Sequence, residues 1–110
     1  MKKLYKYAEH ATCTYIVCDE CGRRAIEEGD FEKLRICNRR LLERLLLDGV
    51  WADIDEDLEY GSSYVYLNPF GDCCAAMKCI DQYLKGKGYK VVKLKYGEEL
   101  DRKWSRFVGD

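Results

Sequence analysis

Residues 10–22 read HATCTYIVCDECG, and they hold three of the seven cysteines of the chain together with its only histidine. Within this stretch, Thr12–Val17 is β-branched or aromatic at nearly every position, which is typical of a buried strand. Cys18 and Cys21 follow directly, separated by two acidic residues. The stretch therefore predicts a strand that leads into a pair of closely spaced thiols.

The composition outside this stretch is that of a globular protein. The chain has 110 residues, of which 47% are hydrophobic and 35% charged, enough to bury a core. We expect residues 1–110 to form a single domain, with a Cys-rich segment at 1–29 and an α/β-packed core at 30–110. The formal net charge of −1 argues against binding of nucleic acid by overall charge. No membrane span and no signal-peptide pattern are visible, so we expect a cytoplasmic location without membrane contact.

The cysteine count bears on the redox state. An odd number of cysteines cannot be fully paired in disulfides, and a cytoplasmic protein is expected to keep its thiols reduced. Cys37 and Cys73 fall on apolar helix faces, where we expect them to act as small buried hydrophobic residues.

A long helix is predicted at residues 30–48. Asp30 is suited to cap its first turn, and Gly49 is suited to end it. The apolar positions recur at helical spacing, at Phe31, Leu34, Cys37, Leu41, Leu42, Leu45 and Leu46.

Shorter elements surround this helix. Strands are predicted at 2–8, 50–59, 64–67 and 89–96, a second helix from Asn68-Pro69 or Asp72 to Gly86 or Gly88, and a short terminal helix at 98–107. We expect 50–59 to be an edge strand, 64–67 to be a more central strand and 23–29 to be a polar connection. In the 89–96 strand we expect Val92, Leu94 and Tyr96 to point inward. The predicted fold is α+β, with a mixed or antiparallel sheet of four to five strands and two main helices packed on it.

The C-x2-C-G motif of Cys18, Cys21 and Gly22 resembles the zinc knuckle of zinc-ribbon and treble-clef domains. Two intervening residues let a tight turn point both sulfurs at one tetrahedral ion. His10 and Cys13 are the nearest second pair, so the predicted site combines Cys18, Cys21, Cys13 and His10 with Zn²⁺ as the cofactor. A strand at 13–18 conflicts with this set, because its ends would lie roughly 17 Å apart at 3.3 Å per residue.

Cys73 and Cys74 are the alternative second pair. Cys74 lies off the apolar face, in the first turn of the second predicted helix, with Lys78 one turn later. Both features favour a thiolate, so Cys74 is an alternative metal ligand or reactive thiol. A strand followed by C-x2-C and a helix is also similar to a thioredoxin-like active site. However, Gly29 leaves room for at most two helical turns, and Pro69 follows a predicted strand rather than preceding one.

The 30–48 helix carries a run of arginines that form like-charge pairs at i,i+4 spacing. They are Arg35, Arg39, Arg40 and Arg44. One interpretation is a partner-binding surface for phosphates or acidic groups. The other is that the acidic run at 53–59 folds back against them, and the near balance of charges favours this second interpretation.

These observations leave three hypotheses for function. The first is a small non-catalytic macromolecule-binding protein, with another protein as partner and a structural zinc site, because no catalytic set is visible and nine tyrosines suit a protein interface. The second is a zinc-dependent nucleic-acid-binding domain that uses the Arg-rich helix. The third is a thiol-dependent redox or transferase enzyme.

Overall fold

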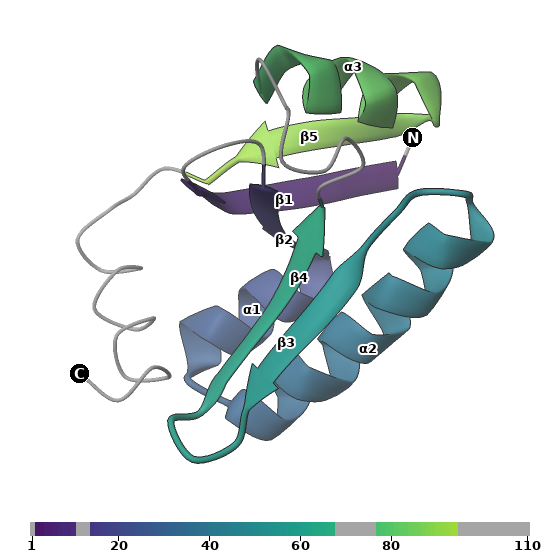
Figure 1. Ribbon diagram of the computed structural model, residues 1–110. Helices are drawn as coiled ribbons and strands as arrows, with labels where there is room; N and C mark the ends of the chain where they lie inside the picture. Colours follow the sequence, from purple (N-terminus) through teal and green to yellow (C-terminus); the bar gives the residue numbers. More distant parts are fainter. Residues whose placement is uncertain (1, 11–13, 68–76, 95–110) are drawn as a thin grey trace.

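The structure is a computed structural model that describes residues 2–10, 14–67 and 77–94 (Figure 1). The elements in chain order are β1 (Lys2–His10), β2 (Thr14–Cys18), α1 (Glu20–Glu28), α2 (Phe31–Leu47), β3 (Asp53–Asp57), β4 (Ser62–Leu67), α3 (Met77–Gly86) and β5 (Tyr89–Lys93). Among the described residues, no helix is both long and apolar enough to cross a membrane.

The five strands form one sheet in the order β3-β4-β2-β1-β5. The β1–β2, β2–β4 and β3–β4 pairs are antiparallel, whereas β1 and β5 are parallel. The sheet is therefore mixed, and the predicted α+β class is confirmed. As predicted, β3 lies at the edge and β4 lies inside the sheet.

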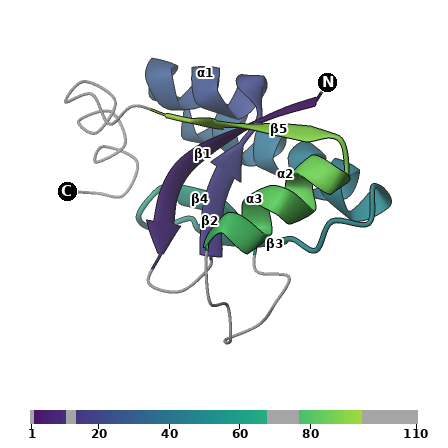
Figure 2. The same ribbon diagram turned by 90° about the horizontal axis from the view of Figure 1, so that it is seen from above.

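One core cluster joins α2 and α3 to a single face of the sheet. Leu41 and Leu45 of α2 belong to this cluster, as do Ile80 and Leu84 of α3. The sheet contributes Leu4, Tyr15, Val17, Val65, Leu67 and Tyr89. Figures 1 and 2 show α3 beside β5 and α2 beside β3 and β4, so the two helices cover opposite ends of the sheet. The prediction of two main helices packed on the sheet is confirmed.

Helix α2 matches the helix predicted at 30–48. The Asp30 carboxylate accepts a hydrogen bond from the backbone N–H of Lys33 at 3.0 Å. Gly49 has a φ of 74°, which is the left-handed conformation expected after a helix C-terminus.

Helix α1 was not predicted, because residues 23–29 read as a polar connection. Asp19 caps this helix by accepting a hydrogen bond from the backbone N–H of Gly22, and Gly29 ends it with a φ of 72°. Arg23 pairs with Glu20 and Glu27 along its surface. Its buried residues are Gly22, Ala25 and Ile26, and the many charged residues of its exposed face made the segment look like a polar connection.

The predicted inward face of the last strand was wrong. Tyr89 is buried and Val91 packs against the core, while Lys90 between them is exposed. Because successive residues of a strand alternate between faces, Val92 lies on the face opposite to Val91. The expected start of the second helix and the predicted helix at 98–107 lie outside the described residues.

Candidate functional site

The cysteines of the C-x2-C motif lie at the junction of β2 and α1. Cys18 ends β2 and is only 3% exposed, and this burial raises the pKa of its thiol above the ordinary value. Cys21 lies in the first turn of α1 and forms a disulfide with Cys37 of α2, with 5.8 Å between the Cα atoms. The expectation of reduced thiols is therefore wrong for this pair, although Cys37 is buried as expected.

The structure describes His10, Cys18 and Cys21 of the predicted zinc set, and it does not bring these three residues together. In the β1–β2 hairpin, His10 pairs with Thr14 and Tyr5 pairs with Cys18. His10 and Cys18 thus lie at opposite ends of β2, separated by roughly 13 Å at 3.3 Å per residue. No group of three or more His, Cys, Asp or Glu residues that fits a metal occurs among the described residues. Cys13 and Cys74 lie outside them, so Zn²⁺ binding stays a prediction.

The arginines of α2 face acidic neighbours. Arg39 makes a two-pronged contact with Glu56 of β3, with N–O distances of 3.2 and 3.0 Å. Arg44 pairs with Asp19 at 3.0 Å, and Arg35 pairs with Glu32 at 2.8 Å. Only the Arg39–Glu56 pair involves the acidic run at 53–59, so that run folds back against Arg39, whereas Arg44 and Arg35 pair with acidic residues elsewhere. Arg40 is the only one of the four without an acidic partner among the described residues.

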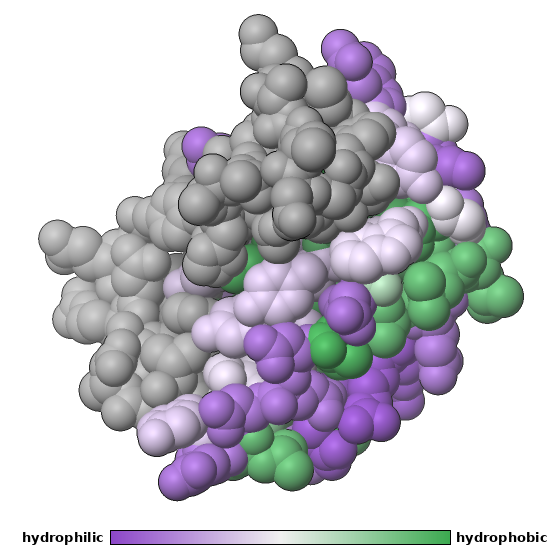
Figure 3. Space-filling model, viewed as in Figure 1, coloured by the Kyte–Doolittle hydropathy of each residue, from purple (hydrophilic) through white to green (hydrophobic). Residues whose placement is uncertain are grey.

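A group of large apolar side chains is exposed where α2 runs into the following loop. Leu46 is 52% exposed, Leu47 is 88% exposed and Trp51 is 49% exposed. We call these three residues the apolar end. Figure 3 shows apolar side chains gathered on the side of the molecule where α2 ends. Single exposed leucines are common on soluble proteins, but three large apolar residues within six positions mark a candidate contact surface.

Strand β3 follows the apolar end and carries four acidic residues in the sequence DIDED. In the described part of the chain it pairs with β4 alone, through the register Asp53–Tyr66 to Asp57–Ser62. Asp53 and Asp55 are exposed. Leu58 and Tyr60, just beyond the strand, are 69% and 57% exposed. An acidic strand at a sheet edge is therefore flanked by exposed apolar side chains at both ends.

Part of this surface could be predicted from the sequence. Trp51 alternates with Val50 and Ala52, which are both buried, so its outward direction follows from strand periodicity. Leu46 was placed on the apolar helix face and is exposed instead, because helical spacing does not show where the sheet ends beneath the helix. Leu47 does not fall on the apolar face of the helix, and this position alone would have predicted that its side chain is exposed.

Comparison with protein-family models, curated proteins and solved structures finds no significant match to this chain.

Proposed function

We propose that the protein is a small non-catalytic module that binds a partner protein through the apolar end and strand β3. The observation that carries this proposal is the exposure of Leu47, at 88%, beside Leu46 and Trp51. The partner segment that fits this surface is basic and extended, with apolar side chains at intervals.

The apolar end supplies binding free energy. Full burial of a leucine or similar side chain contributes about 1.5–3 kcal/mol, and tryptophan is over-represented among the residues that dominate interface energetics. Helix α2 positions Leu46 and Leu47 rigidly, since the face of this helix with Leu41 and Leu45 is fully buried in the core. Little ordering entropy is then lost when a partner binds.

Strand β3 supplies direction and specificity. An extended peptide can add a strand to a sheet edge through main-chain hydrogen bonds. Asp53 and Asp55 are exposed on this strand, so like charge opposes pairing of β3 with a second copy of itself. The same charge favours a segment that carries lysine or arginine.

The test uses a short peptide that alternates lysine and valine, titrated into the ¹⁵N-labelled protein and followed by NMR. We expect saturable binding, with the largest shifts in β3 and in residues 46–51, and about tenfold weaker binding after the double substitution Leu47→Ser and Trp51→Ser, which removes about 1.4 kcal/mol or more of contact energy.

Two controls accompany this titration. A peptide that alternates glutamate and valine should bind far more weakly, because β3 repels it. The Leu58→Ser variant tests whether any exposed leucine suffices, and we expect it to bind nearly as well as the unaltered protein. Equal binding of the basic and acidic peptides, or shifts confined to other strands, would refute the proposal.

A further inference from the structure

The two outer strands of the sheet carry charges of opposite sign. In the order β3-β4-β2-β1-β5, strand β3 forms one edge and β5 forms the other. Within the described part of the chain, β3 pairs only with β4, and β5 pairs only with β1. Strand β3 reads DIDED, whereas β5 reads YKVVK. Strand β5 therefore has the composition that the proposed function requires of a partner segment, with lysines separated by apolar residues.

The directions of the strands allow the two edges of different copies to join. Strand β5 runs parallel to β1, and the pairs β1–β2, β2–β4 and β4–β3 are all antiparallel. It follows that β3 and β5 run in opposite directions. A second copy in the same orientation, placed beside the first, would set its β5 antiparallel to β3. Antiparallel pairs are slightly more stable than parallel pairs, so the sheet can continue from one copy into the next.

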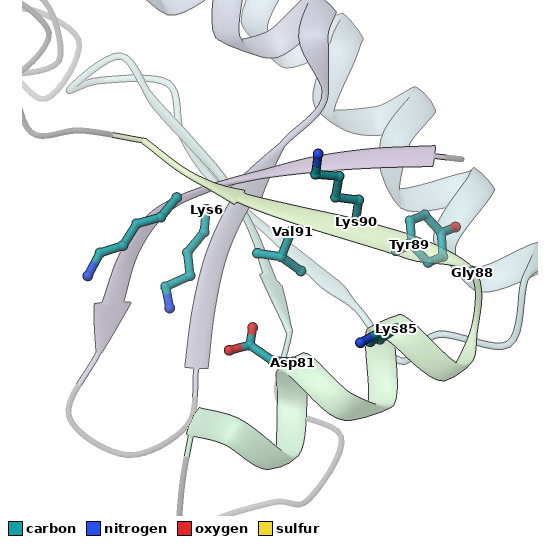
Figure 4. Close-up of a pocket in the computed structure, with 8 residues that line it drawn as sticks. Lys6, Asp81, Lys85, Gly88, Tyr89, Lys90 and Val91 are labelled. Carbon is teal, nitrogen blue, oxygen red and sulfur yellow. The ribbon is translucent and has the colours of Figure 1, made fainter.

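Apolar side chains of both edge strands lie on the face that the helices cover. Ile54 of β3 is the cross-strand partner of Val65, and Val65 belongs to the core between the sheet and the helices. Val91 of β5 packs against the same core, and Figure 4 shows its side chain pointing toward α3. A junction that sets Ile54 opposite Val91 therefore keeps the helices of both copies on one side of the continued sheet.

Val91 has apolar surface left for this contact. A cavity of about 420 Å³ lies beside it, between α3 and β5, with Lys6 and Asp81 also in the lining (Figure 4). Val91 and Ile54 are each only partly buried. The backbone N–H of Leu94 donates to the carbonyl oxygen of Lys6 in β1. Because N–H groups alternate between the two edges of a strand, the N–H of Val91 points to the outer edge.

The opposite face of the junction brings unlike charges together. With Ile54 opposite Val91 in an antiparallel pair, Asp55 is opposite Lys90. Both side chains are exposed, and Figure 4 shows Lys90 pointing away from α3. Opposite charges directly across an antiparallel pair stabilise it, whereas two β3 strands would set like charges against each other. The charges therefore favour a β3–β5 contact over a β3–β3 contact.

The same register connects the junction to the apolar end. Trp51 lies three positions before Ile54 and is 49% exposed, and Leu94 lies three positions after Val91 and is partly buried. The register sets these two residues opposite each other. Contact between them would bury part of the exposed tryptophan, which is a side chain typical of the residues that dominate interface energetics.

We infer that the basic segment bound by β3 is strand β5 of a second copy of this chain, so that the copies associate head to tail. This inference rests on the proposed function, because it names the partner of the same surface. Each copy contributes a different edge, so every added copy leaves one acidic and one basic edge open. The junction joins two strands of five residues each, and this small contact predicts weak association that depends on concentration and salt.

The test is sedimentation velocity of the full chain over a range of protein concentrations at low ionic strength. We expect the weight-average mass to rise with concentration and to pass that of a dimer. Asp55→Lys and Lys90→Glu each set like charges against each other at the junction, so each variant alone should associate at least about tenfold more weakly. An equimolar mixture of the two variants should regain association, because alternating copies oppose unlike charges at every junction.

The matched controls are Glu43→Lys and Lys33→Glu, which make the same changes of charge on α2. Each should associate like the unaltered protein. The inference is overturned if the mass of the unaltered protein stops at that of a dimer, or if mixing the two edge variants restores no association. A chain that stays monomeric but still binds the lysine–valine peptide at β3 would overturn this inference and leave the proposed function intact, whereas loss of both would refute both.

Discussion

At the scale of single residues, Gly22 shows how closely β2 and α1 approach each other. A Cβ atom placed on Gly22 would lie 2.8 Å from the Cβ of Cys18 and 3.4 Å from Oδ1 of Asn38. Asn38 is itself buried and donates hydrogen bonds from Nδ2 to the backbone carbonyl and hydroxyl oxygens of Ser63. The glycine of the C-x2-C-G motif therefore has a packing role in this fold.

The substitution Gly22→Ala tests this packing role. We expect it to lower the free energy of unfolding by about 1–3 kcal/mol, because the added methyl group overlaps Cys18 in a tightly packed region. Gly86→Ala is the matched control, since nothing lies within 4 Å of a Cβ at that position of α3, and it should be neutral or stabilising by about 0.5 kcal/mol. Urea denaturation of both variants gives the comparison. Equal stability of the two variants would contradict the packing role.

Glu20 gives the protein a predictable response to acid. Hydrogen bonds from Arg23, and then from Tyr5, lower the pKa of Glu20 to about 2 from an ordinary value of 4.5. The ionised form of Glu20 is therefore more favourable in the folded state than in the unfolded state. Its contribution to the free energy of unfolding is fully present above the ordinary pKa and is lost as the pH falls toward 2. We expect the thermal unfolding midpoint to decline over this window, and to decline less steeply in Glu20→Gln.

The control for this pH profile is Glu43→Gln on the exposed surface of α2. Its midpoint should follow the unaltered protein across the same window. A Glu20→Gln profile that coincides with both would show that the Arg23 contact has no influence on stability.

At the scale of elements, a helix was predictable where its capping residues and its apolar periodicity were both clear in the sequence. Asp30 and Gly49 indicated both ends of α2, and its apolar face specified the core residues Leu41 and Leu45. Helix α1 has the same kind of caps, Asp19 and Gly29, but it is short and rich in charged residues, and so it was interpreted as a polar connection. Strand β5 has apolar residues of both parities, Val91 and Val92, so alternation could not decide which of them faces the core.

The disulfide between Cys21 and Cys37 ties α1 to α2 and was beyond sequence reasoning, because spacing alone does not specify pairing. Its two cysteines are 16 positions apart, and a loop of this length predicts stabilisation of about 3 kcal/mol through the unfolded state. We expect reductant to lower the free energy of unfolding by about this amount.

Cys37→Ala provides the comparison for this measurement, since reductant should have no further effect on that variant. If denaturation curves of the unaltered protein coincide with and without reductant, the α1–α2 contact is held by packing alone.

At the scale of the whole molecule, one core connects α2, α3 and the sheet, while the proposed binding surface lies outside it. Leu45 is fully buried, whereas Leu47, two positions later on the same helix, is 88% exposed. The α+β class, the edge position of β3 and the interior position of β4 could be predicted from composition and from the alternation of apolar and polar residues. A cavity lined by Lys6, Asp81 and Val91 was not predictable, because these residues come from β1, α3 and β5, which meet only in the folded chain.

The pair Leu45→Ala and Leu47→Ala separates the two roles. Leu45→Ala should cost about 2–5 kcal/mol of unfolding free energy through lost burial and cavity formation. Leu47→Ala should change stability by less than about 0.5 kcal/mol while weakening binding of the lysine–valine peptide. Chemical denaturation and the NMR titration measure the two effects independently. A large loss of stability in Leu47→Ala would place this residue in the core rather than on a binding surface.

The parallel pairing of β1 with β5 has a consequence for synthesis of the protein. Lys2–Lys6 pairs with Tyr89–Lys93, so β1 receives its outer neighbour in the sheet from residues that are synthesised much later. Until then, one side of β1 keeps its hydrogen-bonding groups open, and the cavity beside Lys6 lacks the wall that β5 provides. Nascent chains of this protein should therefore be most dependent on chaperones in the interval before β5 emerges.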